Sequence, residues 1–147
     1  MTDSPANVST ALSTKTGTAT TRDAITLAYT LTGPCDPHPE IPRIVLIHSL
    51  ALDASVWARV KSLLAEHAQV LRYDCRGHGR SGRPAGPYSV AQFGDDLADL
   101  LDHVGWSDAR IAGCSMGGCV AQAFAAQYPK RVRGLVLVDT TDWYGDD

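Results

Sequence analysis

One serine in this sequence is flanked by glycines at the spacing that a catalytic nucleophile needs. Residues 113–118 read Gly-Cys-Ser-Met-Gly-Gly, with Ser115 at the third place. A serine on a sharp turn between a strand and a helix takes a strained backbone conformation, and flanking glycines leave room for it. We therefore predict that Gly113, Gly117 and Gly118 form such a turn, and that it presents the Ser115 hydroxyl as a nucleophile.

Attack of a hydroxyl on a carbonyl group creates a negatively charged oxygen, which backbone N–H groups can stabilise. Met116 would be the first residue of the following helix, so its N–H is free of helical hydrogen bonds and lies at the positive end of the helix. A second donor is expected from the loop His48-Ser49-Leu50. The Leu50 N–H is the best-placed group in that loop.

The flanking segments have the periodicity of a strand and a helix. Residues 109–113 predict a strand, and residues 116–128 predict an Ala-rich helix that ends at Pro129. Asp53 and Ser89 stand where helix N-caps belong. Further strands are predicted at 25–32, 43–48, 69–74 and 134–139, and further helices at 56–64 and 90–104.

The alternation of strands and helices predicts an α/β fold. Right-handed crossovers would join the strands into a mostly parallel sheet with helices on both faces. The apolar runs 43–48 and 134–139 are expected to be strands buried on both faces. Ligands of such sheets lie beyond the carboxyl ends of the strands. That edge would hold 48–50, 74–81, 113–118 and Asp139.

The segment 74–81 allows three interpretations. Asp74 and His78 resemble metal ligands but are too few for a structural metal site. Arg76 and Arg80 could bind an anion. We favour a structural turn, in which Asp74 or Arg76 holds the loop in place.

Two phosphate-binding motifs also resemble the Ser115 segment. A dinucleotide fingerprint needs glycine where Ser115 stands, although Asp139 lies at about the distance expected of a ribose ligand. A P-loop needs Lys and Ser or Thr where this chain has Cys119 and Val120. A nucleotide-binding α/β domain is therefore the less favoured alternative.

Composition limits the classes of function. The chain has 147 residues and a net charge of −3, which gives no general attraction to nucleic acid or anionic membranes. No apolar run approaches the roughly 20 residues of a membrane span. The four cysteines are Cys35, Cys75, Cys114 and Cys119. Their spacing matches no zinc or redox motif, so we expect reduced thiols, no bound metal and a cytoplasmic location.

The first 21 residues are rich in Thr, Ser and Ala, without the basic start and apolar core of a secretory signal. We expect residues 1–21 to form a disordered lead. Residues 22–147 would then form the N-terminal portion of a single domain, since a chain of about 150 residues can bury one core.

Three motifs taken in order resemble the α/β-hydrolase-fold family. They are His48-Ser49-Leu50, Asp74-x-Arg76-Gly77-x-Gly79-x-Ser81, and the glycine-flanked Ser115 segment. Residues 86–101 and 115–122 are most similar to 3-oxoadipate enol-lactonases, with cofactor-free haloperoxidase-like esterases second. Many relatives have His-Gly in the first motif, where this chain has Ser49.

This resemblance implies a serine hydrolase that cleaves a small-molecule ester or lactone through an acyl-enzyme on Ser115, without metal or organic cofactor. It also implies an acid and then a histidine later in the chain. Asp139 is the candidate acid, with a strand-end turn residue as the alternative interpretation. All the histidines precede Ser115, and His78 is the nearest substitute among them; they are His38, His48, His67, His78 and His103.

We therefore expect an α/β-hydrolase fold truncated after its sixth strand. The catalytic histidine, and the acid if it is not Asp139, would come from later residues or from a complementing chain. The last predicted strand, 134–139, would be an exposed sheet edge, through which the chain could also form a homo-oligomer. The alternative is a catalytically inactive fragment or an interaction module.

Overall fold

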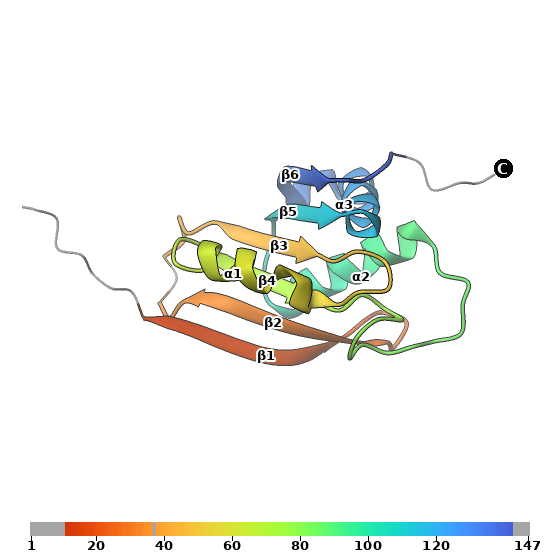
Figure 1. The fold of residues 1–147 in the computed structure, drawn as a ribbon, viewed down its shortest axis with the longest axis horizontal. Coiled ribbons are helices and arrows are strands. Elements are labelled where there is room, and N and C mark those ends of the chain that lie inside the picture. Colours follow the sequence, from red (N-terminus) through yellow and green to blue (C-terminus); the bar gives the residue numbers. More distant parts are fainter. Residues whose placement is uncertain (1–10, 37, 143–147) are drawn as a thin grey trace, which may run out of the picture.

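The computed structural model describes residues 11–36 and 38–142, and these form a six-stranded sheet (Figure 1). The strand order is β1-β2-β4-β3-β5-β6. The last four strands in the sequence run parallel, and β2 runs antiparallel to both of its neighbours. The predicted fold class is confirmed. The strands are β1 (Leu12–Thr20), β2 (Thr26–Pro34), β3 (Arg43–Ile47), β4 (Gln69–Tyr73), β5 (Ala109–Cys114) and β6 (Val132–Val138).

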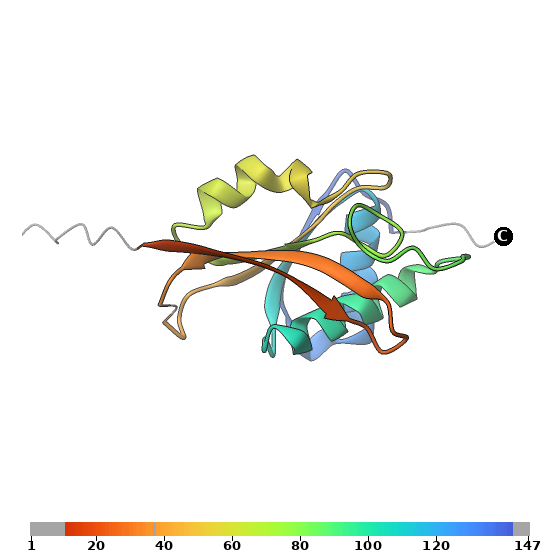
Figure 2. The ribbon, with the colours of Figure 1, turned by 90° about the horizontal axis from the view of Figure 1, so that it is seen from below.

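Helices cover both faces of the sheet (Figure 2). The short 3-10 helix η1 (Ala54–Trp57) and α1 (Ala58–Leu64) lie on one face, and α2 (Val90–His103) and α3 (Met116–Gln127) lie on the other. A second 3-10 helix, η2 (Pro129–Arg131), leads into β6. None of these helices combines the length and hydropathy that a membrane span requires.

The main core lies between the sheet and the α2–α3 layer. Apolar side chains from β2, β3, β4 and β5 meet the buried faces of α2 and α3 there, and include Leu27, Val45, Ile47, Leu71, Leu97, Leu101, Ile111 and Phe124. A smaller cluster under α1 contains Leu46, Ala65, Ala68 and Val70. Both predicted N-caps are confirmed, because Asp53 accepts the Ser55 N–H at 2.8 Å and Ser89 accepts the Gln92 N–H at 3.1 Å.

The predicted disordered lead is wrong for Leu12–Thr20, which forms β1. This strand pairs along its whole length with β2, from Leu12 opposite Pro34 to Thr20 opposite Thr26. Most of its side chains are exposed, so backbone hydrogen bonds rather than a buried face hold it. Its many threonines favour strand structure. Residues 1–10 lie outside the described part of the chain.

Two predicted apolar surfaces are less buried than expected. In β6, Leu135 to Val138 are 39–57% exposed, because no described strand pairs with its outer edge. In the helical region around α1, Val56, Val60 and Leu63 are 46%, 37% and 76% exposed. The prediction that residues 134–139 form a strand buried on both faces is therefore wrong for the described chain.

A buried arginine joins three parts of the fold. The Arg76 side chain donates to Asp96 in α2 at 2.7 and 2.5 Å, and to Asp23 in the β1–β2 turn at 2.9 and 3.0 Å. These bonds raise the pKa of Arg76, with the Asp96 contact contributing most. Donation from Arg76 lowers the pKa of Asp23 to about 2. The favoured interpretation of Arg76, a residue that holds its loop in place, agrees with these contacts.

Replacing this arginine by an apolar residue should destabilise the fold. In Arg76→Met, Asp96 keeps a buried carboxylate without its partner, so we expect the free energy of unfolding to fall by about 3–5 kcal/mol. The measurement is urea denaturation followed by circular dichroism. The control is Arg133→Met, which removes an ion pair with Asp108 from a side chain that is 63% exposed, and should leave stability close to that of the wild type. Equal losses in both variants would contradict this account.

Candidate active site

Ser115 lies on a sharp turn between β5 and α3. Its backbone angles are φ 52° and ψ −119°, a region that residues with side chains rarely adopt. The Ser115 N–H donates to the Val138 carbonyl of β6 at 3.0 Å, and its own carbonyl accepts the Gly118 N–H at 2.8 Å. The structure therefore places Ser115 where the glycine spacing predicted it, at the N-terminus of a helix and at the carboxyl edge of the sheet.

The flanking glycines allow close backbone packing at this turn. A Cβ atom on Gly113 would lie 2.1 Å from the Gly117 carbonyl oxygen, and one on Gly117 would lie 2.3 Å from the Ile47 carbonyl oxygen. A Cβ atom on Gly118 would meet the Thr140 hydroxyl at 2.4 Å. The first turn of α3 therefore packs directly on the end of β3 and on the segment after β6.

The loop after β3 lies against the same turn. The Ser49 hydroxyl donates to the Cys114 carbonyl at 3.3 Å, so the two segments predicted to supply backbone donors are in contact. Leu50 is 59% exposed, and its N–H has no acceptor within the described chain. Ser49 does not adopt a positive φ, and Ala51 does, at 59°. A glycine is therefore not required at position 49.

Two histidines lie at the carboxyl edge, and both are engaged with the backbone. His48 is fully buried, its Nε2 accepts the Cys75 N–H at 2.9 Å, and its Nδ1 lies 2.8 Å from the Ser49 carbonyl. His78 Nδ1 donates to the Arg76 carbonyl at 2.9 Å. Burial lowers the pKa of His48. Neither histidine hydrogen-bonds to Ser115, whose hydroxyl has no hydrogen-bond partner among the described residues.

The other three histidines lie toward the opposite edge of the sheet. One precedes β3, one precedes β4, and one ends α2, where its ring nitrogen lies 3.4 Å from the Tyr29 hydroxyl; they are His38, His67 and His103. The structure therefore does not bring any of the histidines to Ser115 as a general base.

Asp74 is hydrogen-bonded to two loops at the carboxyl edge of the sheet. Its carboxylate is buried and accepts the N–H of Ala54 at 2.8 Å and of Arg80 at 2.9 Å. Gly79 passes so close that a Cβ atom there would lie 2.4 Å from the carboxylate. These contacts agree with the structural turn that we favoured for residues 74–81. In the described ranges, no group of three potential metal ligands gathers here or elsewhere.

Asp139 follows β6 with a positive φ of 46° and an exposed side chain. Its carboxylate makes no ion pair or hydrogen bond with the described residues. The next residue, Thr140, donates its hydroxyl to the Ser115 carbonyl at 2.7 Å. Sequence reasoning missed Thr140, because a threonine after a strand carries no periodic signal.

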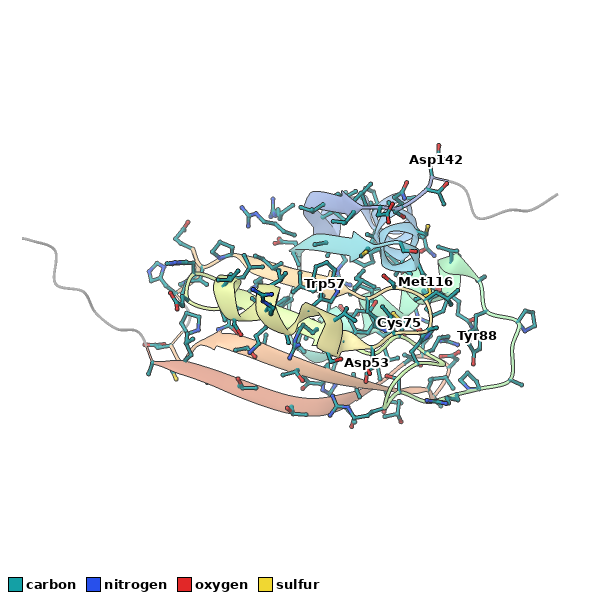
Figure 3. All side chains as sticks on the ribbon, viewed as in Figure 1. Asp53, Trp57, Cys75, Tyr88, Met116 and Asp142 are labelled. Carbon is teal, nitrogen blue, oxygen red and sulfur yellow. The ribbon has the colours of Figure 1, made fainter. Side chains whose placement is uncertain are left out.

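A cavity of about 730 Å³ adjoins this edge, between the N-terminus of α2 and the exposed side of α3. Ser115 does not line it, but Cys119, one helical turn after Ser115, does. Figure 3 shows Cys75, Met116, Tyr88 and Asp142 toward the carboxyl ends of the strands. The cavity is lined by Tyr88, Ser89, Val90, Ala91, Cys119, Gln122, Ala123, Ala126, Thr141 and Asp142.

Comparison with known proteins agrees with this geometry. Residues 42–145 match the family described as alpha/beta hydrolase fold. The chain is 33% identical over 129 residues to 3-oxoadipate enol-lactonase 2 of Acinetobacter baylyi, covering 88% of this chain and 46% of that protein. The similarity to enol-lactonases that the motifs predicted is therefore confirmed.

Solved structures show the same similarity. The enol-lactonase from Burkholderia xenovorans superposes with a TM-score of 0.81 at 37% identity, over 88% of this chain and 48% of that one. A thermophilic esterase from Thermogutta terrifontis superposes with a TM-score of 0.80 at 32% identity, over 90% of this chain and 48% of that one. The chain thus spans about half the length of these relatives.

The strain at Ser115 gives a stability prediction. Residues held in sparsely populated backbone regions cost about 1–3 kcal/mol, and only glycine relieves that cost. We expect Ser115→Gly to be more stable than Ser115→Ala by about 1–2 kcal/mol in urea denaturation. The order should reverse at Ser62, an exposed position in α1, where alanine is favoured by about 1 kcal/mol. An alanine variant at 115 that equals the glycine variant would contradict the prediction.

Proposed function

The chain belongs to the alpha/beta hydrolase fold family, and from that premise we propose that it carries the nucleophile of a serine hydrolase. Ser115 attacks the carbonyl carbon of an ester or lactone as its hydroxyl proton passes to a general base. The bond from the carbonyl carbon to the alcohol oxygen then breaks and that oxygen takes up the proton, so that an ester releases its alcohol, or a lactone ring opens, and an acyl-enzyme forms. Water then attacks the acyl group, releases the acid and restores the hydroxyl. The observation that carries the proposal is the strained turn that holds Ser115 at the start of α3. The reaction as proposed needs no metal or organic cofactor.

The oxyanion formed in both steps is bound by the N–H groups of Leu50 and Met116. Three observations support this assignment. The Leu50 N–H has no acceptor in the described chain, and the Ser49 hydroxyl holds its loop against Cys114. Met116 opens α3, so its N–H lies at the positive end of the helix dipole.

The general base comes from outside these 147 residues, either from further sequence or from a second polypeptide. The positions of the five histidines support this part of the proposal, because those at the carboxyl edge are bound to backbone groups. Asp139 is proposed as the acid that orients the base. Its carboxylate, which has no partner among residues 11–36 and 38–142, follows β6, and the Val138 carbonyl beside it is bonded to the Ser115 N–H.

The proposed substrate is a small ester or lactone. Relatives described as an enol-lactonase and an esterase support this class. The cavity beside α3 is lined by both apolar and polar side chains, which suits a small molecule with apolar and polar parts. The four cysteines are free thiols, which suits the cytoplasm, the location that we propose.

Labelling with a fluorophosphonate tests whether Ser115 is nucleophilic. The reagent phosphonylates activated serines, and added imidazole can replace a missing histidine base. We expect Ser115 to be modified, faster as imidazole is raised, and Ser115→Ala to show no modification by peptide mass spectrometry. The control, Ser62→Ala, removes an exposed hydroxyl on α1 and should label like the wild type. A wild-type protein that stays unmodified at saturating imidazole would refute the proposal.

A second candidate function is supported by the exposed edge of β6. Leu135, Val136, Leu137 and Val138 are large apolar residues on a strand whose outer edge has no described partner. Such an edge is a template for pairing with another strand. The proposal is that β6 pairs with a strand of a complementing polypeptide, or with β6 of a second copy when the chain is alone.

A charged residue on β6 should prevent this pairing. We expect light scattering after size-exclusion chromatography to show concentration-dependent association of the wild type, and a monomer for Val136→Lys. Leu63→Lys is the matched control, because Leu63 is more exposed but lies on α1, and it should leave association unchanged. Association that survives in Val136→Lys, or is lost in Leu63→Lys, would place the contact elsewhere.

A further inference from the structure

The buried imidazole of His48 connects two backbone segments at the carboxyl edge. Its Nε2 lies 2.9 Å from the N–H nitrogen of Cys75, just after β4, and its Nδ1 lies 2.8 Å from the carbonyl oxygen of Ser49. The side chain has no exposed surface. Both ring nitrogens therefore face fixed backbone groups and not solvent.

These two partners determine the protonation of the ring. A backbone N–H can only donate, so Nε2 must carry a lone pair to accept from Cys75. A carbonyl can only accept, so Nδ1 must carry the proton and donate to Ser49. Burial also lowers the pKa of His48, which keeps the ring neutral near neutral pH. His48 is thus a neutral imidazole in a single tautomer.

The bond to Ser49 determines the direction of the next N–H group. In a planar trans peptide, the carbonyl and the following N–H point in opposite directions. The peptide between Ser49 and Leu50 is trans, since the cis bond found in the described residues lies between Gly86 and Pro87. The Ser49 carbonyl accepts from His48 at 2.8 Å and, in a longer bond of 3.3 Å, from the Leu52 N–H. Holding this carbonyl toward the buried ring turns the Leu50 N–H away from the ring, and Leu50 is 59% exposed.

The other side of the ring is anchored to a rigid part of the fold. Cys75 is fully buried, and its burial raises the pKa of its thiol to about 12. The preceding residue, Asp74, is buried and bonded to two loops. The His78 ring packs against His48 with ring centroids 5.1 Å apart. Rotation of the His48 ring would break its bond to Cys75, so the ring has one orientation.

From this geometry we infer that His48 is a positioning residue, which sets the Leu50 peptide with its N–H outward as an oxyanion donor. Its part in catalysis rests on the proposed function. His48 neither touches the reacting atoms nor exchanges a proton, and it acts through the peptide that it holds.

Two substitutions separate the two hydrogen bonds of the ring. In His48→Asn the side-chain nitrogen takes the place of Nδ1 and can still donate to Ser49. In His48→Gln the longer amide reaches the place of Nε2, where it can accept from Cys75. The Ser49 carbonyl then keeps only the longer bond from the Leu52 N–H, at 3.3 Å, and loses the shorter bond from the side chain at position 48. We expect the residual dipolar coupling of the Leu50 N–H to match the wild type in the Asn variant and to change in the Gln variant. The ¹⁵N chemical shifts of the wild-type His48 ring should show that Nδ1 is protonated and that Nε2 is not.

Proton placement on Nε2, or an unchanged Leu50 coupling in a folded Gln variant, would overturn the inference. If the Gln variant does not fold, the wild-type tautomer and the Asn variant still decide it. The labelling rate of Ser115 provides the link to function. The labelling rate should fall roughly 10- to 100-fold in His48→Gln, which is less than the 10²–10³-fold loss from removing an oxyanion donor outright. It should stay close to the wild-type rate in His48→Asn. Absence of wild-type labelling would refute the proposed function alone, because the dipolar couplings do not depend on it.

Discussion

The backbone of Ser115 is held in a conformation that a residue with a side chain avoids, and the surrounding structure compensates for that strain. Such conformations persist only where neighbouring contacts over-determine them. Here the Ser115 N–H is bonded to β6, its carbonyl accepts from Thr140, and glycines on either side let α3 approach the end of β3. The turn therefore depends on β3, β5, β6 and α3 together.

Buried polar groups fix the loops that surround this turn. Asp74 binds the N–H groups of two loops, and Arg76 joins the β1–β2 turn to α2 through Asp23 and Asp96. Each charge is matched by hydrogen bonds, as burial requires. The residues that resemble a metal or anion site in the sequence are thus already occupied by the protein itself.

Periodicity and turn chemistry were sufficient to predict the parallel strands, α2, α3 and the turn at Ser115, because each has a strong local signal. They failed for β1, whose Ser, Thr and Lys side chains have no buried face and whose stability comes from pairing with a distant strand. The roles of Thr140 and His48 could not be predicted either. Each depends on which carbonyl or N–H lies opposite, and the sequence pattern does not encode that juxtaposition.

The contacts of His48 also bear on how this region can change during evolution. The ring binds the Ser49 carbonyl, which every residue type can provide, and the Cys75 N–H, which every residue type except proline can provide. The His48 ring is therefore indifferent to the side chains at positions 49 and 75, which are constrained for other reasons, Ser49 by its hydroxyl bond to the Cys114 carbonyl and Cys75 by its burial in the core. A glycine at position 49 would keep both hydrogen bonds of the His48 ring and lose the hydroxyl bond to the Cys114 carbonyl alone.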